Sequence, residues 1–247
     1  MATALLSPLK ESLQDVEILI YTPSFTSAEK LASIIGGKAI DQIQDLEIDE
    51  LLLCHKPQQL SSVMQDWAGK INPSFVMSLM AGISIKKLKQ HFPNAEFMRW
   101  MPNTPCQVGK GIVTTFSTDS TKASFWESAL QNCAKVFPCE TEELLDETTS
   151  ILGSGPGVIF EFARLFSNEL TRLGVSETDA SELIKTLFFG SASLMKNESL
   201  SFEQLRNNVT SPGGVTQAIL ESLSGNLENN FTNAMKAGQN RTKELNN

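Results

Sequence analysis

The sequence of 247 residues has few of the residue types from which disulfide frameworks and structural metal sites are built. It has four cysteines, none of them in a CxxC pair: Cys54, Cys106, Cys133 and Cys139. A chain of this length does not need covalent cross-links, so we expect reduced thiols. His55 and His91 are the only imidazoles, which argues against a zinc site. We therefore expect no bound metal.

The sequence also lacks a membrane segment and an excess of basic residues. No apolar stretch approaches the roughly 18 residues that a membrane span needs. The first residues, MATALLSPLKESLQD, have neither the basic region nor the long apolar region of a signal peptide. The 20 Lys and Arg against 28 Asp and Glu give a net charge of −8, which disfavours nucleic acid and membranes as partners. We expect a cytoplasmic protein.

What is present is typical of a folded globular chain, with 41% hydrophobic and 19% charged residues. Between residues 16 and 139, short β-branched or aromatic runs alternate with amphipathic ones, which predicts βαβ units and a parallel sheet. The predicted strands span 16–21, 50–55, 74–80, 96–101, 111–117 and 134–139. The predicted helices span about 26–35, 58–69, 84–91 and 121–133. The expected fold class of this part is α/β.

After Thr141 the apolar residues recur at helical spacing, and no further strand is predicted. Ser176 followed by Asp179, and Thr141 followed by two glutamates, are typical of helix starts. We place a domain boundary near residue 146, between an α/β domain of residues 1–146 and an all-helical domain of residues 147–247. The helical part has many apolar positions for its size, so they form either an ordinary core or, as we favour, a contact with a second copy of the chain.

Three loop segments directly follow predicted strands: CHKP (54–57), MAGI (80–83) and RWMPNTP (99–105). In an open α/β sheet, ligands bind beyond the carboxyl ends of the strands. These segments would therefore bring the following residues to one crevice: Lys56, Pro57, Ala81, Gly82, Asn103 and Thr104. Each segment taken alone is equally typical of a plain turn.

A fourth segment, TSPGG (210–214), precedes a helical run that begins near Val215. A helix start of this kind can bind a carboxylate or a phosphate through its N–H groups, although the pattern also describes a generic loop. The sequence has no nucleophile triad and no pair of positioned carboxylates, and Ser154 in GSGPG (153–157) does not have the spacing of a GxSxG elbow. This favours chemistry in which a cofactor supplies the reactive atom, most commonly hydride transfer.

Taken together, these motifs resemble those of the pyrroline-5-carboxylate reductases over nearly the whole chain. The resemblance rests on YTPS (21–24), HKP (55–57), MAGI (80–83), RWMPNTP (99–105), VGKG (108–111), GSGP (153–156), LRNNVTSPGGVT (205–216) and RTKEL (241–245). It implies an N-terminal Rossmann-like domain for NAD(P)H and a C-terminal helical domain that forms a homodimer or a larger homo-oligomer. The implied reaction reduces the cyclic imine of 1-pyrroline-5-carboxylate, a small anion, to L-proline.

By the same resemblance, roles are implied for individual residues. Lys56, Pro57, Ala81 and Asn103, with Gly82 beside them, would line the nicotinamide side. Ser211, Gly213 and Gly214 would hold the substrate carboxylate, and the hydroxyl of Thr216 would face the imine nitrogen as the catalytic group. Thr22 and Ser24 would lie at the cofactor ribose, where the absence of a carboxylate favours NADPH over NADH.

The sequence departs from the family at its start. The family opens with a strand and a glycine-rich turn, GxGNMA, whereas this chain begins MATALLSP, with Met1 at the motif's own methionine. The expected sheet therefore lacks its first strand, and the phosphate loop is absent. Milder departures lie at Leu152, Gly157, Val158, Asn207 and Val215.

Two explanations stay open: a natural chain that starts further upstream, or a reductase-like paralogue that has lost dinucleotide binding and catalysis. Such a paralogue would keep the dimer and bind proline or a similar anion. On either explanation we expect the 247-residue chain to bind NADPH weakly or not at all.

Overall fold

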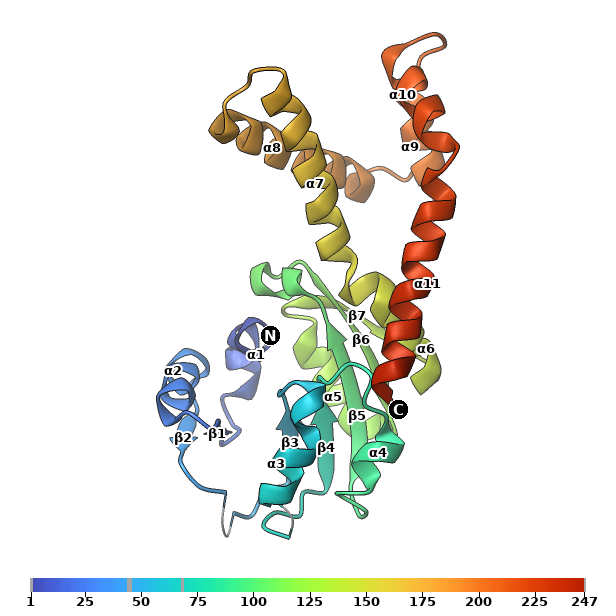
Figure 1. The fold of residues 1–247 in the computed structure, drawn as a ribbon. Coiled ribbons are helices and arrows are strands. Elements are labelled where there is room, and N and C mark those ends of the chain that lie inside the picture. Colours follow the sequence, from blue (N-terminus) through green and yellow to red (C-terminus); the bar gives the residue numbers. More distant parts are fainter. Residues whose placement is uncertain (1, 44–45, 68, 247) are drawn as a thin grey trace. The chain divides into compact units, whose positions relative to one another are not determined.

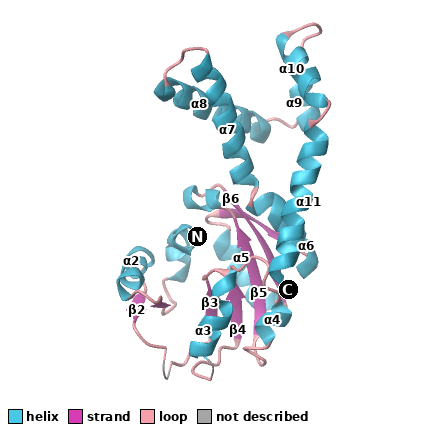
Figure 2. Cartoon of the chain, in the orientation of Figure 1, coloured by secondary structure: helices cyan, strands magenta, loops and turns pink. Residues whose placement is uncertain are grey.

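The computed structural model describes residues 2–43, 46–67 and 69–246, so that Met1 lies outside the described residues. The chain forms two compact units (Figure 1). The first contains the residues up to 156 together with those from 238 onward, and the second contains residues 157–237. The first unit thus extends beyond residue 146 and also includes the C-terminal segment. Figure 2 shows that strands occur in the first unit, whereas the second is helical.

The first unit is built on a five-stranded sheet of order β3-β4-β5-β6-β7. Its strands are β3 (Glu50–Leu53), β4 (Phe75–Ser78), β5 (Glu96–Pro102), β6 (Gly111–Ser117) and β7 (Ala134–Pro138). All neighbours are parallel except β5 and β6, which are antiparallel, so the expected parallel sheet contains one antiparallel pair. The reason is the short connection of residues 103–110, because a parallel crossover needs about a dozen residues or more.

Two further strands, β1 (Leu19–Tyr21) and β2 (Lys38–Ile40), form a separate parallel sheet. The helix α2 (Phe25–Ile35) connects them, and Ile20 packs with Ala28, Ala32 and Ile35 in a small cluster. Within the described residues, no ladder joins these two strands to the five-stranded sheet. The break between the sheets agrees with the expectation of a Rossmann-like sheet that lacks one strand.

Helices cover both faces of the five-stranded sheet because its central strands are apolar on both sides. All four residues of β4 are buried. Phe75 and Met77 pack on one face, whereas Val76 packs on the other, as the alternation of side chains in a strand requires. The first face is covered by α1 (Ala2–Leu6), η1 (Ser7–Leu13) and α5 (Ser120–Leu130). The second is covered by η2 (Pro57–Gln59), α3 (Leu60–Trp67) and α4 (Ile85–Lys89).

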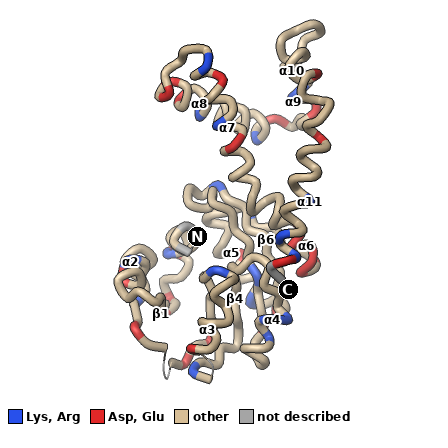
Figure 3. The backbone as a smooth tube through the Cα atoms, viewed as in Figure 1, with Lys and Arg blue, Asp and Glu red and all other residues tan. Residues whose placement is uncertain are grey.

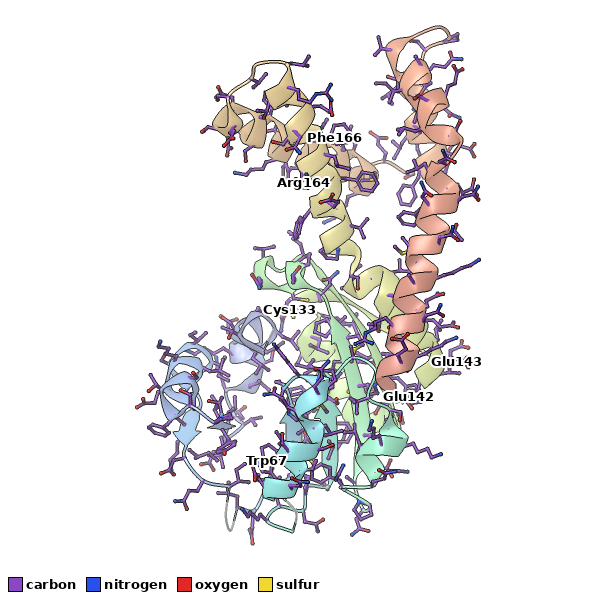
Figure 4. The ribbon with its side chains drawn as sticks, viewed as in Figure 1. Trp67, Cys133, Glu142, Glu143, Arg164 and Phe166 are labelled. Atoms are coloured by element: carbon purple, nitrogen blue, oxygen red, sulfur yellow. The ribbon has the colours of Figure 1, made fainter. Side chains whose placement is uncertain are left out.

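A buried arginine ties the helix α6 (Glu142–Thr148) to the sheet. The side chain of Arg99, on β5, is fully buried and donates to Glu142 Oε1 at 2.8 Å and to Asp146 Oδ1 at 2.7 Å. The same Glu142 oxygen accepts from the backbone N–H of Ile85, at the start of α4, at 2.7 Å. One carboxylate therefore joins a strand and two helices, and Figure 4 marks its position on α6.

The remaining elements are helical. They are η4 (Thr149–Gly153), α7 (Gly155–Arg172), α8 (Glu177–Asn197), α9 (Phe202–Asn208), α10 (Val215–Ser224) and α11 (Leu227–Asn246), with a 3-10 turn η3 (Thr104–Val108) earlier in the chain. Two predicted helix starts are confirmed: Ser176 accepts from the amide of Asp179, and Thr141 accepts from that of Leu144.

The second unit has almost no core of its own. Of residues 157–237, only Ala180 and Ile184 are buried. Large apolar side chains are exposed instead, including Phe160 (63%) and Phe189 (76%). No helix among the described residues is long and apolar enough to span a membrane. Figure 3 shows Lys and Arg interspersed with Asp and Glu along the described parts of both units.

Candidate functional site

Three of the predicted loop segments follow strand ends that lie side by side. Leu53, at the end of β3, pairs in register with Ser78, at the end of β4, and Ser78 pairs with Arg99 on β5. Because these strands are parallel neighbours, the chain leaves the sheet at one edge in all three cases. The structure therefore brings to this carboxyl edge the predicted residues Lys56, Pro57, Ala81, Gly82 and Asn103.

The first loop, after β3, presents a cation and a neutral imidazole. Lys56 is exposed, and its backbone N–H donates to Gln59 Oε1 at 3.1 Å, which fixes the turn into η2 at Pro57. His55 Nε2 is buried and has no hydrogen-bond partner among the residues that the structure describes. Desolvation lowers the pKa of His55 below its ordinary value of 6.5, so this imidazole is neutral at pH 7. Sequence analysis did not single out His55 as a site residue, although it lies inside the CHKP segment.

The second loop, after β4, is shaped by small residues. Ser78 is fully buried, and its Oγ accepts from the backbone N–H of Met80 at 3.2 Å. Gly82 is buried with a φ of +70°, in the left-handed region that favours glycine. Ala81, between them, is half-buried. The backbone can therefore turn sharply here and leave room for a flat group.

The third loop, after β5, is held in place by Asn103. This side chain is 6% exposed, and both of its polar atoms bind protein. Oδ1 accepts from the backbone N–H of Ile112 at 2.9 Å, and Nδ2 donates to the carbonyl of Leu152 at 3.1 Å. Asn103 thus joins the end of β5 to β6 and to η4. Both polar atoms of its amide are thus engaged by the protein.

The structure does not bring Thr22 and Ser24 to this group. They follow β1, whose last residue, Tyr21, packs edge-on against Trp67 with ring centroids 5.9 Å apart. Trp67 ends α3, the helix that starts after the Lys56 turn and runs back toward the start of β4 (Figure 4). Thr22 and Ser24 therefore follow a residue, Tyr21, that contacts the far end of α3 from Lys56.

The TSPGG segment lies in the second unit and leads into α10, as predicted. Gly213 has a φ of +71°, and its N–H donates to Gln217 Oε1 at 2.7 Å. The N–H of Gly214 donates to the carbonyl of Ser211 at 2.9 Å, and a Cβ at this glycine would overlap Ser211 Oγ. No side chain caps α10, so the backbone N–H groups of its first turn do not donate to a capping side chain. Thr216 lies in that first turn and is half-buried.

The described residues contain no group of three or more His, Cys, Asp and Glu side chains that could hold a metal ion. The first unit thus contains one candidate region, the carboxyl edge of the sheet, and the second unit contains another, the start of α10.

Comparisons with known proteins give one consistent result. Residues 142–245 match a family model described as pyrroline-5-carboxylate reductase dimerisation. A pyrroline-5-carboxylate reductase of Staphylococcus epidermidis is 32% identical over 223 residues, which cover 88% of this chain and 82% of that protein. One of Synechocystis is 31% identical over 204 residues, which cover 79% of this chain and 74% of that protein.

Solved structures agree in fold. A pyrroline-5-carboxylate reductase from Coxiella burnetii superposes with a TM-score of 0.85 at 26% identity, covering 100% of this chain and 95% of that one. A pyrroline carboxylate reductase from Plasmodium falciparum, solved with NADP bound, superposes with a TM-score of 0.82 at 24% identity, covering 100% of this chain and 96% of that one.

Proposed function

This chain belongs to the pyrroline-5-carboxylate reductase family, and on that premise we propose that it reduces the C=N bond of 1-pyrroline-5-carboxylate to give L-proline, with NADPH or NADH as the hydride donor. The observation that carries the proposal is the convergence of the CHKP, MAGI and MPNTP segments at one edge of the sheet. This is the edge at which open α/β sheets bind their ligands.

The carboxyl edge fits the nicotinamide half of such a cofactor. Ala81 and Gly82 leave room for a flat ring, and the buried Nε2 of His55 has hydrogen-bonding capacity that no protein group uses. The exposed ammonium of Lys56 suits the cofactor's negative charge. When bound, the reduced nicotinamide supplies a hydride to the imine carbon. The NADP-bound Plasmodium structure supports the view that the fold accommodates this cofactor.

The residues expected at the adenosine half of the cofactor do not lie at the carboxyl edge. Among the described residues, Thr22 and Ser24 follow a strand whose one partner is β2, and Thr22 Oγ1 donates to the carbonyl of Ser24 at 2.6 Å. We therefore propose a binding region for the nicotinamide half alone and assign no contact to the pyrophosphate.

For the substrate, we propose the start of α10. The ring carboxylate would bind at the uncapped amides of this helix, where the helix dipole favours an anion, with Ser211, Gly213 and Gly214 forming the turn that precedes them. The hydroxyl of Thr216 would donate to the imine nitrogen and so supply or relay its proton. Orientation of the two reactants would contribute most of the acceleration.

We also propose that the chain works as a homodimer or larger homo-oligomer. The second unit has two buried residues and many exposed phenylalanines and leucines, a composition that is stable in water only when the apolar surface is covered. A second copy of the same helices is the partner that the matched dimerisation model supports.

The test is an assay of the purified full chain with 1-pyrroline-5-carboxylate and NADPH, followed by the loss of NADPH absorbance and the appearance of proline. Thr216→Ala should lower kcat by about 10²-fold or more, because it removes a positioned proton donor. Thr216→Ser should retain much of the activity. Thr186→Ala, on an exposed face of α8, is the matched control and should leave kcat unchanged. Equal rates for Thr216→Ala and Thr186→Ala would remove Thr216 from the reaction.

The separate β1–β2 sheet favours one alternative, a noncatalytic member of the family that binds proline or a similar anion. Calorimetry separates the two functions. An enzyme shows turnover together with measurable NADPH binding, whereas the alternative predicts a proline-binding isotherm, no NADPH isotherm and no proline formation.

A further inference from the structure

Two of the four cysteines meet inside the first unit. Cys106 lies in η3 and Cys133 immediately precedes β7, and both have no exposed surface. They belong to one core cluster, which also contains Trp100 and Trp126. The other two are separate: Cys54 is exposed after β3, and Cys139 is buried in a different cluster beside Leu145.

Gly111 has no side chain, and this leaves room for the two cysteines to lie close to it. The N–H of Gly111, the first residue of β6, points to the carbonyl of Cys133 at 3.4 Å. On the other side, a Cβ at Gly111 would overlap Cys106 Sγ, so the sulfur occupies the space that a side chain would fill. Both cysteines therefore contact Gly111 and lie in one core cluster.

The surroundings make the two sulfurs unequal. Cys133 Sγ donates to the carbonyl of Leu130 at 3.3 Å. Cys106 Sγ lies 3.9 Å from both Asn103 Oδ1 and the carbonyl of Ile112. The hydrogen bond with Cys133 lowers the pKa of Cys106 to about 7 and raises that of Cys133. Because the thiolate is the nucleophile in thiol chemistry, Cys106 is the sulfur that reacts first.

We propose that Cys106 and Cys133 form a redox-active pair that hydrogen peroxide converts into an intramolecular disulfide. The Cys106 thiolate attacks one peroxide oxygen, the O–O bond breaks and hydroxide leaves, which gives a sulfenic acid. The Cys133 sulfur then attacks the Cys106 sulfur, the S–O bond breaks, and water leaves with the proton from Cys133. In sum, the two thiols lose two protons and two electrons, and one peroxide becomes two waters.

Hydrogen peroxide can reach the pair through the exposed segment that follows Cys106 in the sequence. Gln107, Val108, Gly109 and Lys110 are all exposed, and Val108 is 72% exposed. Local opening of this segment would uncover Cys106 without unfolding the sheet. Once formed, the disulfide would tie η3 to the start of β7 and thereby fix the loop that begins at Asn103.

The experiment uses the full chain and peptide mapping. The folded protein is treated with hydrogen peroxide, the peroxide is removed, and free thiols are alkylated under denaturing conditions before trypsin digestion. Cleavage after Arg99, Lys110, Lys122 and Lys135 separates Cys106, in residues 100–110, from Cys133, in residues 123–135. We expect these two peptides to be joined, with the loss of two hydrogens, and to separate again after reduction.

Cysteine-to-serine variants show which residues form the cross-link. Cys54→Ser and Cys139→Ser should leave the linked peptide unchanged, and Cys133→Ser should abolish it while leaving Cys106 oxidised to a sulfenic acid that a dimedone probe traps. The proposal is overturned if both peptides of the unmodified chain remain alkylated at peroxide concentrations that oxidise Cys54. It is equally overturned if the cross-links formed involve only Cys54 or Cys139. The unmodified chain decides the question even if Cys133→Ser does not fold.

Discussion

Arg99 offers the sharpest test of how the first unit is held together. Its side chain is fully buried, whereas those of Glu142 and Asp146 are 26% and 18% exposed. Replacing Arg99 by methionine keeps an apolar stem of similar length and removes the charge. The two carboxylates then lose their common cation, and Glu142 still accepts from the backbone N–H of Ile85, at the start of α4.

The expected cost follows from this burial. Removing one partner of a fully buried ion pair typically costs about 3–5 kcal/mol, because the remaining charge stays uncompensated. Both carboxylates here reach water in part, so we expect a loss near the lower end, about 3 kcal/mol. Glu142→Gln keeps an oxygen acceptor for Ile85 and leaves Asp146 on the guanidinium, so its cost should be smaller, about 1–2 kcal/mol.

Urea unfolding, monitored by tryptophan fluorescence, measures the change in the free energy of unfolding of the first unit. All three tryptophans, Trp67, Trp100 and Trp126, lie in the first unit with Arg99. The matched control is Glu143→Gln, an exposed neighbour of Glu142 on α6, which should change the free energy of unfolding by less than about 0.5 kcal/mol (Figure 4). If Arg99→Met changed the free energy of unfolding no more than Glu143→Gln does, the role assigned to the buried arginine would be wrong.

Four further outcomes are expected. Gly111→Ala should destabilise the first unit by about 1–3 kcal/mol in the same urea assay because its Cβ overlaps Cys106 Sγ, whereas Gly155→Ala, with open space around it, should be near neutral. Disulfide formation between Cys106 and Cys133 should accelerate as the pH rises through about 7, as the thiolate of Cys106 forms; a rate independent of pH would contradict this. Below pH 6.5 the unfolded chain protonates His55 while the folded chain keeps it neutral, so stability should fall with falling pH, and His55→Gln should reduce that slope. Isothermal calorimetry should give NADPH binding that is measurable but weaker than micromolar, because Thr22 and Ser24 do not lie with the residues of the carboxyl edge; a micromolar dissociation constant would refute this.

The sequence predicted the strands of the five-stranded sheet well because each is a short apolar run bounded by turn residues. All of β4, for example, falls within the predicted run of residues 74–80. It did not predict β2, since Lys38–Ile40 is only three residues long and follows two glycines without any alternation of polarity. The reversed direction of β6 was also missed, although the short connection of residues 103–110 contains the signal.

The sequence predicted the part of the candidate site that lies directly after the strands of the sheet. Residues that directly follow neighbouring strands, such as Lys56 and Ala81, are placed by the sheet itself, so their convergence can be foreseen from their positions in the sequence. The position of Thr22 depends on which strand β1 pairs with, and strand partners are set by contacts distant in sequence. The engagement of Asn103 with Ile112 and Leu152 likewise depends on tertiary packing, which no local pattern encodes.

The scarcity of buried residues in the second unit, where only Ala180 and Ile184 lie inside, has a consequence for how this protein is handled. Helices that hide their apolar faces only against another molecule owe their folding free energy to association, and mass action then makes that energy depend on protein concentration. On dilution the helical half should loosen before the sheet does, so melting temperatures measured at two concentrations describe two different populations of the same chain.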